Sequence, residues 1–531
     1  MTMQMPFSDF EWNVPERFNF AVDVVDYWAK NGDQLALVWE NTAGESRAFT
    51  YGDISRLSKR LAHALQAQGV AKGDPVLVVL PRVPEWQIAI TAAMRIGAVP
   101  VPCIEMLTPK DIAYRATHCG AKAVICRAEH APAITPGLDS VSVRFTVGQH
   151  DGWHDVNAAF DQPIEADAAE VLAEDPAILY YTSGSTGNPK GVLHSSRGVY
   201  AWRYSARFWL DVQPGDRIWC TADTGWSKAG TSILFGPWSE GGTAFFYDGP
   251  FDPKERLGLL QDHQIIIYCA PGTELYRIVQ EDVSAYDLPA LRRTVTAGEA
   301  MNVAVADAWK DATGLTIAET YGQTETLMTL LTLVGLEPRI GSMGVAAPGV
   351  EMAVITDAGH VLPDGEVGNI AMKQPNPQMM LGYLNAPEKL AENIVETPEG
   401  KWFITGDMGH RDGEGFFWYS GRSDDIINSA GYRIGPTEVE NALAEHPAVL
   451  ECAAVAAPDA ERGSVVKAVI VLKPGHAPSD ALTHEIQTHV KKVTAPYKYP
   501  RIIEYRTALP KGTTGKILRR ALRDEAAKAM K

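Results

Sequence analysis

A short segment rich in glycine and hydroxyl side chains is the first place where this sequence could do chemistry. Residues 182–191, TSGSTGNPKG, contain three glycines, four hydroxyl side chains and Lys190. An apolar run, 177–181, precedes the segment, and another begins at Val192. Amides and hydroxyls at the end of a buried strand are suited to bind phosphate, so we expect an anion-binding loop. A plain surface turn is the alternative interpretation.

The segment is not the P-loop of nucleotide hydrolases. That pattern requires a second glycine five residues after the first and a Ser or Thr after the lysine. Here Pro189 and Gly191 occupy those two positions. The loop is therefore expected to contact a nucleoside triphosphate with a different geometry.

Four further segments offer polar groups in flexible surroundings. They read YGQTE at 321–325, TGD at 405–407, GR at 421–422 and PKGTTGK at 510–516. Taken alone, each segment is weak evidence for a binding or catalytic site. A helix cap is enough to explain Thr-Glu, and a mobile basic tail is enough to explain the last segment.

Length, charge and cysteine usage restrict the class of protein. The 531 residues exceed what one core supports, and the formal net charge of −17 argues against a nucleic-acid partner. The six cysteines are scattered without metal-ligand spacing, which indicates a reducing compartment. No secretory signal is visible, and no apolar run approaches the ~20 residues that span a bilayer. We expect a soluble cytoplasmic enzyme without stable membrane insertion, either a monomer or a homodimer.

The first half of the chain alternates between helical and strand patterns. A capping box at 50–53 begins an amphipathic helix that ends near Gly69. Wholly apolar strands are expected at 75–80 and 123–126, with helices at 84–96 and 111–119. This alternation predicts a parallel or mixed sheet with helices on both faces.

The pattern of apolar and polar residues changes after Val350. Short alternating runs at 351–356 and 368–373 predict an antiparallel region. Helices at 437–446 and 480–493, with strands at 453–457 and 465–472, predict a small separate unit. The fold class is α/β: a large N-terminal domain of doubly wound mixed sheets with a β-rich subdomain, and a small mobile α+β C-terminal domain. The terminal segment LRRALRDEAAKAMK is expected to be a solvated helix.

Taken together and in this order, the segments resemble the acyl-adenylate-forming (AMP-binding) superfamily, which includes acyl-CoA synthetases, adenylation domains of peptide synthetases and luciferases. The resemblance runs from the helix at Tyr51 to Lys516. It rests on YYTSGSTGNPKG, YGQTET, TGD, GRSDDIINSAGYRIGPTEVE and LPKGTTGKILRR. The sequence is most similar to medium-chain acyl-CoA synthetases, whose corresponding segments also read YGQTET and GYRIGP.

The resemblance implies a two-step ligation that uses ATP, Mg²⁺ and coenzyme A. A carboxylic acid first forms an acyl-AMP with release of pyrophosphate, and coenzyme A then displaces AMP to give a thioester. By the same resemblance, the nucleotide contacts are Thr182, Ser183, Gly184, Ser185, Thr186, Gly187 and Lys190 at the phosphates, Gly298, Glu299 and Ala300 at the adenine, and Tyr321, Gly322, Gln323 and Thr324 in the second motif.

Five side chains have more specific implied roles. Thr324 contacts the α-phosphate and Glu325 binds Mg²⁺, while Asp407 accepts hydrogen bonds from the ribose with assistance from Arg422. Lys516 bridges the α-phosphate and the attacking carboxylate, where a cation stabilises developing charge.

The family also implies that the small domain rotates between the two steps. The predicted domains are 1–423 and 424–531, with a hinge at Asp424. Rotation withdraws Lys516 and brings Gly431 and Arg433 to the channel for the pantetheine arm of coenzyme A.

The acid itself is less well defined. Acetate-specific relatives have a tryptophan at the position of Gly322, so glycine predicts a longer pocket that takes a medium-chain, branched or aromatic acid. Trp226, Lys228, Leu327 and Met328 are candidate pocket residues, with ordinary core packing as the alternative. Two other functions remain open: an adenylating enzyme that loads a carrier-protein thiol, and an inactive nucleotide-binding regulator.

Overall fold

The computed structural model describes residues 7, 9–30, 32–163, 166–182, 188–298, 301–398, 400–423, 425–429, 432–459, 462–511 and 517–529. The chain divides into two compact units. The first contains residues 1–351 and 375–392, and the second contains 352–374 and 393–531. The boundary predicted at Asp424 falls within the second unit and stays a prediction, because that residue lies outside the described ones.

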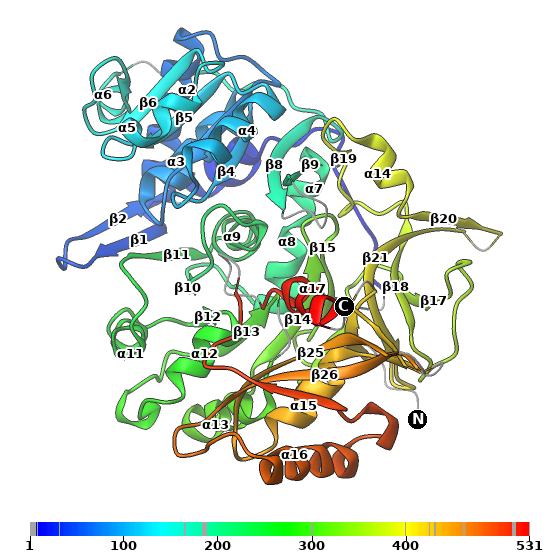
Figure 1. Ribbon diagram of the computed structural model, residues 1–531. Helices are drawn as coiled ribbons and strands as arrows, with labels where there is room; N and C mark the ends of the chain where they lie inside the picture. The colour runs from blue at the N-terminus through cyan, green and yellow to red at the C-terminus, as the bar shows by residue number, and fades with distance from the viewer. Residues whose placement is uncertain are drawn as a thin grey trace. The chain divides into compact units, whose positions relative to one another are not determined.

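A parallel sheet in the first unit has the order β4-β3-β5-β6-β7. Its strands are β3 (Pro75–Val79), β4 (Val99–Cys103), β5 (Ala123–Arg127), β6 (Val143–Val147) and β7 (His154–Asp155). The helices α2 (Tyr51–Ala67), α3 (Pro84–Arg95) and α4 (Pro109–Cys119) lie beside it (Figure 1). The predicted capping box of α2 is present, since the side chains of Thr50 and Asp53 each accept a hydrogen bond from the other's backbone amide. The predicted alternation is confirmed here.

A longer sheet of the first unit carries the YGQTE segment. The order in this unit is β2-β1-β11-β10-β12-β13-β14-β15-β16, parallel from β1 to β14 and antiparallel at both ends. The strands are β1 (Leu35–Asn41), β2 (Ser46–Thr50), β10 (Arg217–Cys220), β11 (Thr243–Asp248), β12 (Ile267–Cys269), β13 (Arg293–Ala297), β14 (Ala318–Gln323), β15 (Leu327–Leu331) and β16 (Ser342–Ala346). The carboxyl ends of the parallel strands meet at one edge, where α/β proteins bind ligands.

The glycine-rich loop connects two strands of a third, smaller sheet. Strand β8 (Pro176–Thr182) pairs antiparallel with β9 (Lys190–Ser195), and β9 pairs antiparallel with β19 (Gly382–Tyr383). A buried strand therefore delivers the loop as predicted, and the loop joins two antiparallel strands as a hairpin.

The second unit begins with an antiparallel sheet, β17-β18-β21-β22, with β20 paired to β21. Its strands are β17 (Met352–Ile355), β18 (Gly368–Gln374), β20 (Ile394–Thr397), β21 (Gly400–Arg411) and β22 (Phe417–Arg422). The antiparallel arrangement predicted from the alternating pattern is confirmed.

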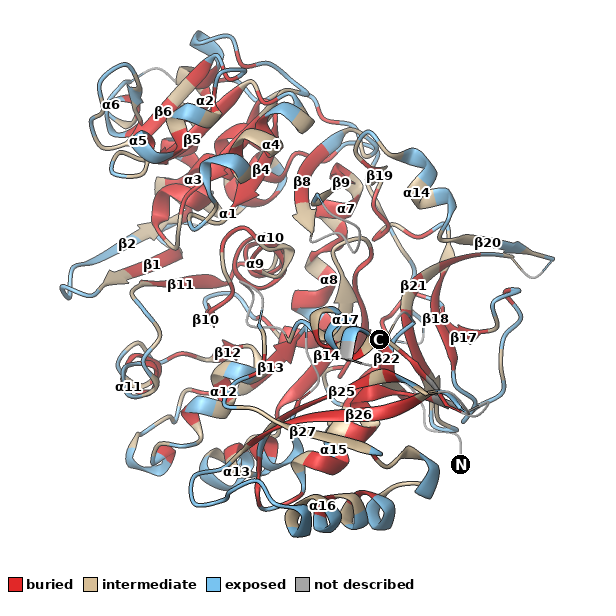
Figure 2. Cartoon of the chain, viewed as in Figure 1, coloured by how far each residue is buried: buried red, intermediate tan, exposed pale blue. Residues whose placement is uncertain are grey.

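The rest of the second unit is an α+β arrangement. Its elements are β23 (Ile427–Ser429), β24 (Tyr432–Ile434), α15 (Pro436–Ala444), β25 (Val449–Asp459), β26 (Gly463–Leu472), α16 (Asp480–Val493), β27 (Ile502–Tyr505) and α17 (Arg519–Ala529). Figure 2 shows the buried strands β25 and β26 in contrast to the largely exposed α16. The terminal helix α17 is not merely solvated as predicted, because Leu522 and Ala526 on one face are buried against these strands.

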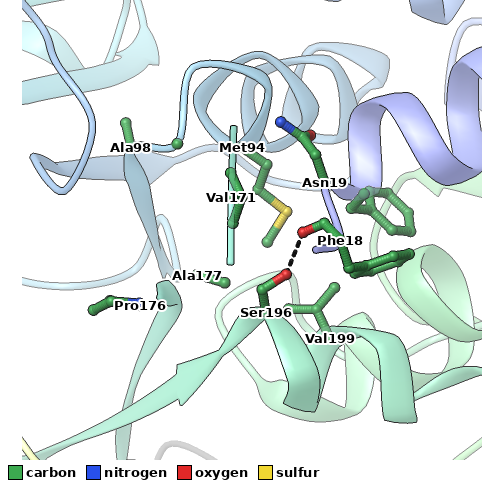
Figure 3. A pocket seen from close by; sticks show the side chains of 11 residues that line it. Phe18, Asn19, Met94, Ala98, Val171, Pro176, Ala177, Ser196 and Val199 are labelled. Atoms are coloured by element: carbon green, nitrogen blue, oxygen red, sulfur yellow. Dashed lines mark hydrogen bonds between the residues drawn. The ribbon is translucent and has the colours of Figure 1, made fainter. Parts of the chain in front are cut away.

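A small cavity lies elsewhere in the first unit, between the N-terminal segment and the start of β8. Its volume of about 20 Å³ suits a single water molecule and is too small for a substrate. Ser196 on its wall donates a hydrogen bond to the backbone carbonyl of Phe18 (Figure 3). The cavity therefore belongs to the packing of the first unit.

Candidate active site

The glycine-rich loop is bounded by two of its predicted ligands. Thr182 ends β8 and Lys190 begins β9, and the two are paired across the hairpin. The ammonium of Lys190 lies 5.0 Å from the ring centroid of Tyr383 on the adjacent strand β19. Of the residues between them, Ser183 to Gly187 lie outside the described ones, so their phosphate contacts stay predictions.

The Thr-Glu motif forms the turn between β14 and β15. Thr324 and Glu325 belong to a three-residue turn, 324–326, that joins these antiparallel strands. The helix cap considered from the sequence is therefore wrong. Leu327, the first residue of β15, is buried with a positive φ of 57°, a conformation that costs a non-glycine residue free energy and recurs at functional sites.

Glu325 is held from the small sheet. The Tyr383 hydroxyl donates to its carboxylate oxygen Oε1 over 2.8 Å, and the amide of Met380 donates to its backbone carbonyl over 2.9 Å. Since the Tyr383 ring also contacts Lys190, one tyrosine joins the predicted metal ligand to the predicted phosphate ligand.

Thr324 is held from two other directions. Its hydroxyl lies 3.1 Å from that of Ser227, and its carbonyl oxygen lies 2.6 Å from Nε2 of His194. Ser227 begins the short helix α9 (Ser227–Ala229), between the predicted pocket residues Trp226 and Lys228. The candidate acyl segment therefore contacts the candidate phosphate turn.

Lys228 extends the same segment toward the predicted adenine site. Its ammonium donates to the carbonyl of Ala297 over 3.1 Å, directly before Gly298. Gly298 has a φ of 94°, which glycine adopts readily and other residues rarely adopt. Glu299 and Ala300 lie outside the described residues.

Gly322 is tightly constrained by the backbone. A Cβ atom there would lie 2.0 Å from the carbonyl oxygen of Leu327 on the paired strand. Glycine is therefore required at this position by the hairpin, whatever the size of the acyl pocket. The pocket candidates Leu327 and Met328 are buried in β15, while Trp226 is half-buried. Tyr321 and Gln323 flank Gly322 on β14 and are half-buried.

The second unit contains the predicted ribose ligands. Asp407 on β21 and Arg422 on β22 are paired across the sheet, with 3.5 Å between Nη1 and Oδ1. The Asp407 side chain is 7% exposed and that of Arg422 is 48% exposed. The amide of Asp407 donates to the hydroxyl of Thr405 over 3.2 Å, which fixes the backbone of the TGD motif.

Several predicted residues of the second unit cannot be placed. Lys516, Asp424 and Gly431 lie outside the described residues, as does the side chain of Arg433. Their roles stay predictions.

The site contains contributors that the sequence motifs did not single out. Ser227, His194 and Tyr383 belong to none of the motifs named above. Glu319 lies earlier on the same strand as Tyr321, β14, and its buried carboxylate accepts hydrogen bonds from the amides of Met301 and Gly341. Burial raises the pKa of Glu319 to about 7, and the two amides oppose that rise.

Comparison with known proteins bears on the class of this chain. The family model for the AMP-binding enzyme matches residues 25–384, and the model for the AMP-binding enzyme C-terminal domain matches residues 438–516. The mitochondrial acyl-coenzyme A synthetase ACSM3 of Mus musculus is 40% identical over 97% of this chain and 92% of its own. The mitochondrial acyl-coenzyme A synthetase ACSM5 of Homo sapiens is 40% identical over 96% of this chain and 91% of its own.

Two solved structures are similar over nearly the whole chain. The anthranilate CoA ligase AuaEII in complex with anthranoyl-AMP has a TM-score of 0.87 and 31% identity, covering 99% of this chain and 100% of its own. A benzoate CoA ligase from Burkholderia xenovorans LB400 has a TM-score of 0.82 and 30% identity, covering 95% and 100%. The matched family and these relatives show an AMP-forming acid–thiol ligase. The chain belongs to the AMP-binding enzyme family.

Proposed function

We propose that the protein joins a medium-chain carboxylic acid to coenzyme A through an acyl-AMP. A carboxylate oxygen first bonds to the α-phosphorus of ATP, and the bond to pyrophosphate breaks. The coenzyme A sulfur then bonds to the acyl carbon and loses its proton, and AMP leaves. The observation that supports this most is the hydrogen-bonded cluster that joins Thr324 and Glu325 to the candidate acyl segment at Ser227 and to Tyr383 beside Lys190.

The residues around Glu325 fit a magnesium–phosphate site. Among the residues that the structure describes, no group of three or more His, Cys, Asp or Glu side chains could enclose a metal. Mg²⁺ bound with a nucleotide needs no such group, because one or two carboxylates, water and the phosphates complete its shell. When bound, Mg²⁺ neutralises phosphate charge. Tyr383 orients the Glu325 carboxylate toward that task.

The remaining side chains bind and orient the nucleotide. The Thr324 hydroxyl donates to an α-phosphate oxygen, and Ser227 limits its rotation. Lys190 adds a positive charge beside the phosphates. In the second unit, the Asp407 carboxylate accepts hydrogen bonds from the ribose hydroxyls, with Arg422 beside it. In phosphoryl transfer, positioning of this kind is most of the protein's contribution to catalysis.

The step-specific roles of the C-terminal region belong to the same proposal. Lys516 neutralises charge on the α-phosphate during adenylation and is then withdrawn by rotation about Asp424. Gly431 and Arg433 then serve the second step. The family resemblance supports these roles.

An aromatic acid is the second candidate substrate. The similarity to anthranilate and benzoate CoA ligases favours it, whereas the YGQTET motif and the similarity to acyl-coenzyme A synthetases favour an alkyl acid.

A panel of acids separates the two. Acetate, butyrate, octanoate, isovalerate and benzoate are each incubated with enzyme, ATP, Mg²⁺ and coenzyme A, and AMP release is measured. We expect kcat/KM to be highest for octanoate or butyrate. A preference for benzoate supports the second candidate. If none of the acids in the panel gives AMP release, both candidates are refuted.

Location and assembly stay predictions. No helix in the described part of the chain is long and apolar enough to cross a membrane. The two relatives named above are mitochondrial proteins, so the cytoplasmic location expected from the sequence is untested. A monomer and a homodimer are both compatible with the proposal.

A further inference from the structure

His194 lies at the junction of the two segments assigned to phosphate. It belongs to β9, four residues after Lys190, and its side chain is fully buried. Its Nε2 atom lies 2.6 Å from the carbonyl oxygen of Thr324, which is 130 residues away in the sequence. This contact joins the strand that leaves the glycine-rich loop to the Thr-Glu turn.

The partner of His194 fixes its protonation state. A carbonyl oxygen only accepts hydrogen bonds, so Nε2 must carry the hydrogen and donate it. Burial lowers the pKa of His194 to about 4, so the ring is neutral near pH 7. Its Nδ1 atom has no hydrogen-bond partner within the described residues. Gly198, which has no side chain, lies beside this atom, since a Cβ atom there would be 3.0 Å from Nδ1. Among the described residues, Thr324 is therefore the one hydrogen-bond partner of this buried ring.

A second chain of contacts connects His194 to the other side of Thr324. The His194 ring packs against that of Trp202, with 5.5 Å between centroids. The indole N–H of Trp202 donates to the Thr231 hydroxyl over 2.6 Å, and this hydroxyl donates to the Ser227 carbonyl over 3.2 Å. Since the Ser227 hydroxyl contacts that of Thr324, the carbonyl and the side chain of one threonine are both fixed.

We propose that His194 is a positioning residue for acyl-AMP formation. Its Nε2–H holds the Thr324 carbonyl and so keeps the Thr324–Glu325 turn aligned with the hairpin that carries the phosphate loop. The proposal rests on the proposed function of this site. Loss of the bond removes the donor from the partly buried Thr324 carbonyl and lets the turn shift, and displacements of about 1 Å can cost two orders of magnitude in rate.

Three substitutions separate the hydrogen bond from ring packing. In His194→Gln the amide nitrogen reaches the position of Nε2, so we expect near-normal activity. In His194→Asn the amide is one carbon too short, and in His194→Phe the donor is absent. For these two variants, acid-dependent exchange of pyrophosphate into ATP is expected to fall about 10- to 100-fold in kcat, with a smaller change in the KM for ATP. Thioester formation from presynthesised acyl-AMP is expected to change far less.

Tyr51→Phe is the matched control. The Tyr51 hydroxyl also donates to a buried backbone carbonyl, that of Gly242, over 2.7 Å. Removing it should lower thermal stability, as in His194→Phe, and leave pyrophosphate exchange per folded enzyme unchanged. Equal activity of the Gln and Asn variants, or equal loss in both half-reactions, would overturn the proposal.

A measurement on the unmodified protein covers the case in which the variants do not fold. In protein labelled with ¹⁵N at histidine, His194 is expected to be neutral with its proton on Nε2 from pH 5 to pH 8. A proton on Nδ1 would overturn the proposal. If unmodified enzyme gives no exchange with any acid of the panel, the proposed function fails, whatever the tautomer.

Discussion

The Thr324–Glu325 turn of the first unit and the Asp407–Arg422 pair of the second unit are held in different ways. The turn is fixed by side chains from β9, α9 and β19, and all three of these hydrogen bonds are partly buried. The pair is one buried carboxylate beside a guanidinium that is about half exposed. An exposed partner contributes little free energy, because water screens the charge and the side chain keeps its freedom.

This difference matches the tasks in the proposed reaction. Phosphate and metal contacts must be preorganised before adenylation, because charge develops there in the transition state. A ribose contact only has to bind. Substitutions in the first unit should therefore lower kcat, and substitutions of the ribose pair should mainly raise the KM for ATP.

The largest expected effect is at Lys516, the proposed adenylation cation, which belongs to neither of these two regions in the sequence. Lys516→Ala should lower acyl-AMP formation about 1,000-fold or more, because no other cation is assigned to the attacking oxygen. Thioester formation from presynthesised acyl-AMP should be largely spared. Pyrophosphate exchange and a direct thioester assay measure the two steps. Equal loss in both would contradict a separate conformation for each step.

Substitutions of Gly322 test how rigid the hairpin of β14 and β15 is. Gly322→Trp should shift preference toward acetate or propionate if this position ends the acyl pocket. A Cβ alone already meets the Leu327 carbonyl at 2.0 Å, so Gly322→Ala should also lower stability, by about 1–3 kcal/mol. Thermal unfolding and the acid panel measure both effects. If Ala and Trp reduce activity equally with every acid, the position acts on the hairpin backbone and not on the pocket.

The buried carboxyl of Glu319 makes the stability of the first unit depend on pH. Burial raises the pKa of Glu319 from 4.5 to about 7, so the folded state holds a proton that the unfolded state has lost. The stability contributed by this carboxyl is complete below about pH 4.5 and is lost as pH rises through about 7. Glu319→Gln should therefore gain stability relative to the unmodified protein between pH 5 and pH 8, by up to about 3 kcal/mol. Denaturant unfolding at several pH values measures the free energy of unfolding of both proteins. If the two plots of this free energy against pH are parallel, the prediction is wrong.

The smallest effect is expected at Asp407 and Arg422, the proposed ribose ligands. Asp407→Asn should raise the KM for ATP about 10-fold or more, because it removes a charged hydrogen-bond acceptor. Arg422→Lys should change it less, because that side chain is half-exposed. Initial rates at varied ATP give both values. A fall in kcat with an unchanged KM would place Asp407 in the chemistry and remove the contrast between the regions.

Local patterns in the sequence predicted the elements, and long-range contacts account for what was missed. The capping box at 50–53 and the apolar run at 75–80 predicted α2 and β3, because caps and uniform hydrophobicity act within a few residues. The small sheet around the glycine-rich loop was not predictable, since its third strand, β19, pairs with β9 from nearly two hundred residues later in the sequence.

The same reasoning applies to the site. Motifs predicted Thr324, Glu325, Asp407 and Arg422, whose chemistry is visible in their residue types. They could not assign Ser227, His194 or Tyr383, whose importance comes from the partners they reach in the fold. Gly322 shows a different limit: its pocket role was inferred from a relative's larger residue, while the backbone 2.0 Å from its missing Cβ is visible only in the structure.

The most direct test of acyl-AMP formation omits coenzyme A. Concentrated enzyme is incubated with ATP, Mg²⁺ and octanoate in excess over active sites, and the products are identified and quantified by mass spectrometry. We predict about one octanoyl-AMP and one pyrophosphate per active site, with free AMP appearing only after coenzyme A is added. Release of ADP and phosphate, or no acyl-AMP with any acid of the panel, would contradict the account.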